Sequence, residues 1–307
     1  MSGTKKITVI SVIVVVFLVY ASTLCQAAKP LVVTTTTDLA DFVSKVAGDR
    51  LEVYSIARGT EDPHFIEPKP SHITKLKKAK LYFVMGMQME IGYSPVLERG
   101  ANRPDLSYGG SNYIDCSKVI RPIEVPDMAD RAKGDIHPQG NPHYMTDPQN
   151  AVLVVDYIAK ALKAHFPESS EYFEKNRAEY VGKLKEKMKE WEKALAPYKG
   201  TKVVTYHKNW SYFFRRYHFD LVGTVEPIPG IPPSPAHVSK LIGIMKAQGC
   251  KYILMAAYFE RKTPEAIAKA TGAKIVVVPV MTKATKDVPD YINFIDYVVK
   301  SMVKELK

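Results

Sequence analysis

The amino-acid sequence predicts an α/β protein made of two α/β lobes joined by a long, rigid helix. The chain has 307 residues, more than one ordinary hydrophobic core organises, which favours about two domains. Hydrophobic residues make up 46% and charged residues 24%, a balance that excludes a disordered chain. Short apolar runs alternate with helical patterns in both halves, whereas the middle of the chain is helical only.

The predicted strands are mostly apolar over consecutive positions, as in parallel strands that are covered on both faces. They are Leu31–Thr36, Leu51–Ile56, Lys80–Met85, Lys202–Tyr206, Lys251–Ala256 and Lys274–Val278. Predicted helices between them are Asp38–Val46, Ser71–Ala79, Ser234–Ala247 and Thr263–Thr271. Pro70-Ser71 and Pro233-Ser234 each precede a helix and then a strand, so we expect a serine cap in both and a weak internal similarity between the lobes.

The middle of the chain predicts a helical connector. No strand pattern occurs between Asp147 and Lys199, and Pro167 separates the amphipathic stretch Ala151–His165 from the longer pattern Ser169–Ala196. A helix over the latter would be about 42 Å long. It lacks the Gly/Ser-rich composition of a flexible linker, so we prefer a rigid connector to a surface helix of one domain. The predicted domains are residues 28–167, the connector 168–199, and residues 200–307.

The N-terminus resembles a secretory signal. Lys5 and Lys6 precede the uncharged run Ile7–Tyr20, which is too short to span a bilayer as a helix, and small residues follow. We therefore expect a cleaved signal peptide over residues 1–27, with cleavage after Ala27 or Ala28, although a short membrane anchor is an open alternative. Leu24 stands where a lipoprotein site has a small residue, so we do not expect a lipid on Cys25.

Export bears on the cysteines and on the charge. Cys116 and Cys250 would remain in the exported chain, and we expect two buried thiols without a disulfide bridge or a cysteine metal cluster. The chain carries a net charge of +11, which loss of Lys5 and Lys6 reduces to +9. Lysines of the connector alternate with glutamates, as on a solvated helix face, so we do not expect a nucleic-acid partner.

Three of the eight histidines stand in unusual contexts. Pro63 and Pro142 stiffen the backbone before His64 and His143, and His207 closes a predicted strand, where α/β sheets place ligand sites. Three neutral imidazoles suit Zn²⁺. Their spacings of 79 and 64 residues match no zinc finger and no HExxH motif. Taken one at a time, each is better explained as a loop histidine that is hydrogen-bonded to the backbone.

Longer motifs around these histidines carry a resemblance to a known family. They are Asp62-Pro63-His64 with Glu67-Pro68-Lys69-Pro70-Ser71, Asn141-Pro142-His143 with Asp147-Pro148, His207 with Tyr212-Phe213-Phe214, and Glu226-Pro227-Ile228-Pro229-Gly230 with Pro233-Ser234. As an ordered set over the mature chain, they resemble the metal-binding class of periplasmic solute-binding proteins, which serve ABC importers for zinc or manganese.

The resemblance implies that a metal ion sits in the cleft between the lobes, with His64, His143 and His207 as its ligands. Histidine at position 207, where manganese-type members carry glutamate, favours zinc as the transported ion, with manganese or iron as the alternative. The resemblance therefore implies a periplasmic, monomeric receptor that delivers Zn²⁺ to a membrane permease. It implies no enzyme activity. A zinc hydrolase with Glu61 as its base is the alternative from another class.

Two departures from the family pattern concern the remainder of the site. The stretch that usually supplies a carboxylate as fourth ligand reads Val280-Met281-Thr282-Lys283-Ala284, so Asp287, Asp290, Glu260 or water could complete the site. The long histidine-rich loop of many zinc-type members is replaced by a short segment with His137, which we expect to be exposed or to support a ligand rather than to be an accessory ligand. We expect structural roles for His72, His165, His218 and His237, whereas Asp62, Glu67 and Asn141 could orient imidazoles.

Overall fold

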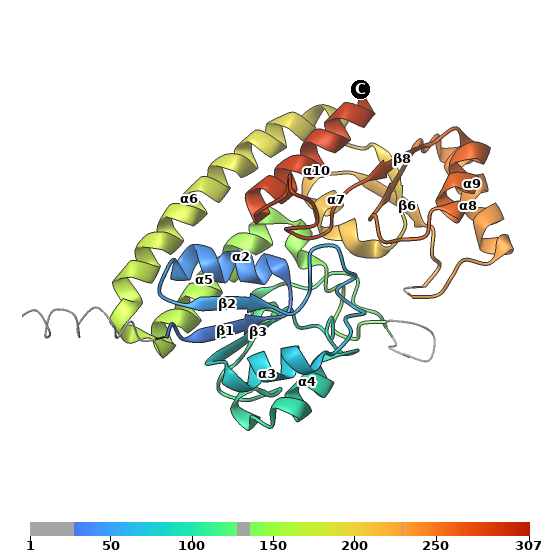
Figure 1. The fold of residues 1–307 in the computed structure, drawn as a ribbon. Coiled ribbons are helices and arrows are strands. Elements are labelled where there is room, and N and C mark those ends of the chain that lie inside the picture. The colour runs from blue at the N-terminus through green and yellow to red at the C-terminus, as the bar shows by residue number, and fades with distance from the viewer. Residues whose placement is uncertain (1–27, 128–135, 229) are drawn as a thin grey trace, which may run out of the picture. The chain divides into compact units, whose positions relative to one another are not determined.

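Two four-stranded parallel sheets form the centre of the fold (Figure 1). The computed structural model describes residues 28–127, 136–228 and 230–307, and the predicted signal peptide lies outside them. The first sheet has the order β2-β1-β3-β4, and the second has the equivalent order β6-β5-β7-β8. The strands of the first sheet are β1 (Leu31–Thr34), β2 (Glu52–Ser55), β3 (Leu81–Val84) and β4 (Tyr113–Asp115). Those of the second sheet are β5 (Lys202–Thr205), β6 (Asp220–Thr224), β7 (Tyr252–Met255) and β8 (Lys274–Val277).

Helices connect the parallel strands or follow the last strand in both lobes. In the first lobe they are α2 (Thr37–Ala47), α3 (Pro70–Lys78), α4 (Ser94–Ala101) and α5 (Pro148–His165). In the second lobe they are α7 (Ser211–Tyr217), α8 (Pro235–Gln248), α9 (Lys262–Thr271) and α10 (Tyr291–Leu306). The predicted α/β class is therefore confirmed, and each predicted strand and helix is present with slightly different ends.

The sequence analysis missed β4, β6, α4, α7 and α10. Strand β4 has three residues, and β6 contains Gly223 and begins at an exposed aspartate, so neither shows a long apolar run. The internal similarity is real, because α3 and α8 occupy the same place in the two sheet topologies. Ser234 caps α8 by accepting from the His237 amide at 3.2 Å. The expected cap at Ser71 is wrong, since α3 begins one residue earlier with Pro70 in its first turn and Lys69 as the N-cap.

Helix α6 (Ser170–Leu195) connects the two lobes and packs on both of them (Figure 1). Its 26 residues correspond to a length of about 39 Å. It contacts α2 and α5 of the first lobe and α10 of the second. Asn176 Nδ2 donates to the Val46 carbonyl at 3.0 Å, and Trp191 Nε1 donates to Asp296 at 3.1 Å. The helix is thus held at both ends, as expected of a rigid connector.

Buried polar contacts also join the lobes directly. Asp38 accepts a hydrogen bond from the Thr282 amide at 2.8 Å, and the Thr37 hydroxyl donates to the Thr282 carbonyl at 2.8 Å. A Cβ on Gly59 would lie 2.1 Å from that carbonyl, so only glycine permits this close approach of two loops. A further hydrogen bond joins the two lobes, in which the Tyr291 amide donates to Asp41 at 3.0 Å.

Two further expectations concern cysteines and the membrane. Cys116 and Cys250 are free and buried, as expected. Within the described ranges, no helix combines the length and the apolar character needed to cross a bilayer.

Candidate metal centre

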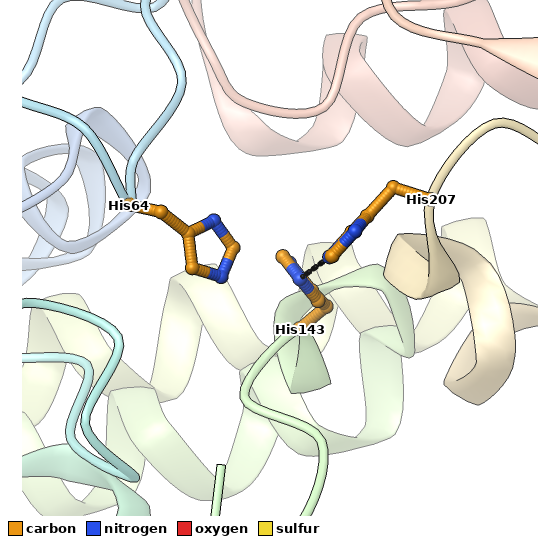
Figure 2. A group of neighbouring side chains, drawn as sticks. All are labelled: His64, His143 and His207. Atoms are coloured by element: carbon orange, nitrogen blue, oxygen red, sulfur yellow. Dashed lines mark hydrogen bonds between the residues drawn. The ribbon is translucent and has the colours of Figure 1, made fainter. Parts of the chain in front are cut away.

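The three singled-out histidines converge at one point. His64, His143 and His207 each offer a ring nitrogen, and these three atoms lie within 4.8 Å of one another. Figure 2 shows their rings facing each other from three separate segments of the chain. The closest pair is His143 Nε2 and His207 Nε2, which are 2.9 Å apart. All three imidazoles are largely or wholly withdrawn from solvent, with His64 only 6% and His207 only 8% exposed.

His64 is held by the turn that the sequence Asp62-Pro63-His64 forms after β2. Asp62 Oδ1 accepts from the His64 backbone amide at 3.0 Å and also lies 3.0 Å from the His64 ring Nδ1. One carboxylate therefore fixes both the backbone and the ring. Because a carboxylate only accepts, Nδ1 carries the proton and the lone pair of Nε2 is directed at the site.

His143 comes from the loop before α5, and Asn141 shapes that loop. Asn141 Oδ1 accepts from the His143 amide at 2.9 Å. The Asn141 amide group in turn donates to Glu124 at 2.9 Å and to the Lys208 carbonyl at 2.8 Å. Lys208 directly follows His207, so Asn141 connects the segments of two ligand candidates from different lobes. The expected orienting role thus fits Asp62 and Asn141.

His207 follows β5, and a glutamate that sequence reasoning had left without a role holds its ring. The Glu226 carboxylate contacts His207 Nδ1, and both side chains are buried. Thr205 of β5 is paired with Thr224 of β6, and each of the two groups stands two residues beyond these partners. Equal distance from paired positions on parallel strands is the signal that could have found Glu226.

The electrostatics favour a neutral imidazole at His143 and an ionised carboxylate at Asp62. Burial lowers the pKa of His143 well below its usual value, and the nearby His207, His64 and His137 lower it further. Burial would raise the pKa of Asp62, but hydrogen bonds and the charge interaction with His64 outweigh it and hold that pKa below its usual range. A neutral imidazole is the form that binds a metal ion, so the site is prepared for a cation.

His137 is the fourth histidine at this place, and of the two alternatives expected for it, exposed or supporting a ligand, the structure excludes the exposed one. It is 8% exposed, and its Nδ1 lies 3.0 Å from the Met87 carbonyl oxygen. Its Nε2 lies 3.2 Å from His64 Nε2. His137 therefore borders the three-histidine group on the side of His64.

The residues considered for a fourth ligand lie elsewhere. Glu260 caps the first turn of α9 by accepting from the Lys262 and Thr263 amides. Asp290 caps α10 and lies 3.3 Å from Lys45 Nζ, and Asp287 is exposed. Thr282 is buried in the contact with Asp38. Within residues 28–127, 136–228 and 230–307, no carboxylate oxygen joins the group that the three histidines form.

The remaining histidines lie outside that group. His72 is buried in α3, where its Nδ1 lies 3.5 Å from the Lys69 amide. His237 is bonded to the Thr224 carbonyl at 2.9 Å, His165 to the Ala161 carbonyl at 2.8 Å, and His218 ends α7 in a left-handed conformation. These contacts agree with the structural roles expected from the sequence.

The chain has two α/β lobes, each with a parallel sheet, and a helix that connects them. Histidines from both lobes converge at one point, and this combination defines a metal-binding solute receptor. The family model described as zinc-uptake complex component A, periplasmic, matches residues 32–305, and the chain belongs to this family. The resemblance inferred from the histidine motifs is confirmed. The family is described as a component of zinc uptake, in agreement with the expected class of solute-binding protein.

Curated relatives and solved structures are similar to this chain. The zinc-binding protein AdcA of Streptococcus pyogenes serotype M1 is 26% identical over 284 residues, which cover 89% of this chain and 55% of AdcA. The manganese ABC transporter substrate-binding lipoprotein PsaA of Streptococcus pneumoniae is 30% identical over 191 residues, or 61% of this chain and 58% of PsaA. The matched part of the chain thus spans little more than half the length of each of these relatives. The crystal structure of ZnuA has the same fold, with a TM-score of 0.74, 24% identity, and coverage of 91% of this chain and 100% of ZnuA.

Proposed function

We propose that this protein is a zinc receptor that captures Zn²⁺ outside the cytoplasm and delivers it to the permease of an ABC importer. The observation that carries the proposal is the convergence of His64, His143 and His207 within 4.8 Å. Their Nε2 atoms would be the ligands, with distances of about 2.0–2.1 Å to the ion. No bond of the substrate is made or broken, so binding and release are the whole activity.

The ligand type supports zinc over manganese. Imidazole nitrogen suits zinc, whereas manganese is better served by carboxylate, carbonyl and water oxygens. The two nearby carboxylates, of Asp62 and Glu226, contact ring Nδ1 atoms instead of pointing at the site. Manganese is the alternative ion, because PsaA is named as a manganese protein and is 30% identical to this chain over 191 residues. Copper is a competitor on affinity alone.

The same two contacts speak against the zinc hydrolase considered from the sequence. A hydrolase needs a general base beside the metal-bound water. Asp62 and Glu226 are occupied by the rings that they orient, and Glu61 accepts from the Arg58 amide at 2.8 Å. The site therefore supports capture of an ion rather than hydrolysis.

The proposal includes features that follow from the family and the N-terminal pattern. The family is described as periplasmic, and the charged and apolar pattern of residues 1–27 supports export with a cleaved signal peptide. We take residues 28–167 and 200–307 as the two lobes and residues 168–199 as the connector. A monomer docking on a membrane permease is the working assembly.

Competition titration of metal-free protein against a chelator tests the choice of ion. Zn²⁺ should bind much more tightly than Mn²⁺ under the same conditions, and one equivalent should saturate the protein. A preference for Mn²⁺ would transfer the proposal to the manganese alternative. Absence of tight binding for both ions would remove the receptor function itself.

A further inference from the structure

We infer that His137 supplies the fourth nitrogen ligand to the zinc ion, so that the site consists of four imidazoles. This inference rests on the proposed function and deepens it. It concerns the position for which the sequence offers no convincing carboxylate. It starts from the contact between His137 Nε2 and His64 Nε2, which are 3.2 Å apart.

The protonation of the two rings makes this contact informative. The Nδ1 of His137 lies 3.0 Å from the Met87 carbonyl oxygen, which can only accept, so Nδ1 carries the proton. The Nδ1 of His64 carries its proton toward Asp62 for the same reason. Both Nε2 atoms are then unprotonated, and two facing lone pairs repel each other. A cation bound to both nitrogens turns this repulsion into attraction.

The spacing suits a tetrahedral zinc ion. With ligands at about 2.0–2.1 Å, two ligand nitrogens of a tetrahedral site lie about 3.3–3.4 Å apart. The pair His64 and His137 is separated by 3.2 Å, and the pair His143 and His207 by 2.9 Å. The four rings thus form two close pairs. The ring nitrogens that all lie within 4.8 Å of one another are those of His64, His143 and His207, so His137 reaches the group through His64 and would approach His143 and His207 when the ion binds.

His137 faces the same space as two of the other ligand candidates. A cavity of about 260 Å³ is lined by His137, His143 and His207, together with Asn141 and Glu124. A second cavity of about 230 Å³ is lined by His207 and His64, together with Asp62 and Glu226. His137 is therefore part of the wall of the cavity that borders His143 and His207.

The turn whose Met87 carbonyl orients the His137 ring has an unusual backbone conformation. The Met87 carbonyl that orients its ring belongs to a turn in which Met87 and Gln88 both have positive φ angles, 51° and 61°. Residues with side chains rarely adopt this conformation, and it persists only where the surroundings enforce it. Glu90 enforces it here, because its buried carboxylate accepts from the Met85 amide at 2.6 Å and from the Gly86 amide at 3.2 Å.

A turn after His137 completes the arrangement. The Gly140 amide donates to the His137 carbonyl at 3.1 Å, and Gly140 has a φ of 108°. A Cβ at this position would lie 2.8 Å from the Ile123 carbonyl oxygen, so glycine is required. The turn joins His137 to the Asn141 and His143 segment and keeps both histidines on the same cavity.

Nitrogen-15 NMR of the histidine rings tests the inference directly. On addition of one equivalent of Zn²⁺, the Nε2 signals of four histidines should shift, and His137→Ala should remove one of these four. Zinc affinity of this variant should fall at least about 10-fold, because even residues that only support a ligand have effects of that size. Its preference for Zn²⁺ over Mn²⁺ should narrow, since water would replace a nitrogen ligand.

Two variants provide the controls. His72→Ala removes a buried histidine of the same lobe outside the group and should bind Zn²⁺ like the wild type. His143→Ala should lose most of the binding. If only three ring signals shift and His137→Ala binds like the wild type while His143→Ala does not, the inference is wrong and the receptor function stands. If His143→Ala also binds like the wild type, the proposed site itself is wrong.

Discussion

The imidazole of His207 and the carboxylate of Glu226 meet because each stands two residues beyond a pair of partnered positions on neighbouring parallel strands. The partnered residues are Thr205 of β5 and Thr224 of β6. The register of the second sheet therefore determines which nitrogen of His207 faces the site. Glu226 keeps the proton on Nδ1 and raises the basicity of Nε2.

Glu226→Gln should weaken zinc binding by about 10- to 100-fold, since the negative partner of His207 is lost while the size of the side chain is kept. Chelator competition measures the change. Glu260→Gln is the matched control, because Glu260 lies in the same lobe but only caps α9 and should leave the affinity unchanged. Equal affinities of both variants would mean that Glu226 does not act through His207.

Removing any ligand candidate should have a larger effect than removing any other histidine. His64→Ala, His143→Ala and His207→Ala should each lower zinc affinity by more than about 100-fold, whereas His165→Ala and His237→Ala should not. Calorimetric titration gives the affinities. Zinc should raise the melting temperature of the wild type and of the control variants. It should raise the melting temperature of the ligand variants much less. Wild-type affinity in His207→Ala would show that the ion does not bridge the lobes.

Zinc affinity should decrease as the pH falls through about 6.5, because protons compete for the imidazole nitrogens. Burial lowers the pKa of His143 well below the usual value, so its proton competes only in more acidic solution than an ordinary histidine would. A chelator titration repeated between neutral and mildly acidic pH measures this dependence. An affinity that does not change over this range would indicate carboxylate ligands instead.

The buried contact between the lobes predicts that the free energy of unfolding decreases as the pH rises, whereas zinc affinity should increase over the same range. Burial raises the pKa of Asp38 from 3.8 to about 7. The folded protein therefore binds a proton that the unfolded chain has lost, and this group's contribution to stability is lost as the pH rises from about 4 to about 7. In Asp38→Asn this loss should be absent, since the amide oxygen can still accept from the Thr282 amide.

Urea unfolding of metal-free protein at pH 5 and pH 8 measures the effect. The change in the free energy of unfolding between these values should differ between wild type and Asp38→Asn by on the order of 2 kcal/mol. Asp41 and Glu90, whose pKa values burial raises to about 6 and about 7, are present in both proteins, as is His143, so the comparison isolates Asp38 together with its charge interaction with Asp41. An identical pH dependence in the two proteins would contradict the assignment to Asp38.

The sequence by itself determined most of the longer helices and strands and the histidines to consider. Apolar runs such as Leu81–Val84 and the charged pattern of α6 are local, and local patterns predict strands and helices. Pro63 and Pro142 identified His64 and His143 because proline restricts the backbone wherever it occurs. The missed elements β4 and β6 are short or partly exposed, so their sequences lack a clear period.

Only the tertiary structure decided how these histidines meet and what surrounds them. Positions 64, 143 and 207 are separated by 79 and 64 residues, and no local pattern fixes a distance across such intervals. The place of Glu226 depends on strand register, and that of His137 on a turn held by Glu90 more than 40 positions earlier in the chain. Thr282 lies in the stretch where the family pattern usually has a carboxylate ligand, and its amide is instead hydrogen-bonded to Asp38 across the lobe contact. Such relationships arise from packing between distant segments, which is why the sequence identified the ligand candidates but not the geometry that makes them a site.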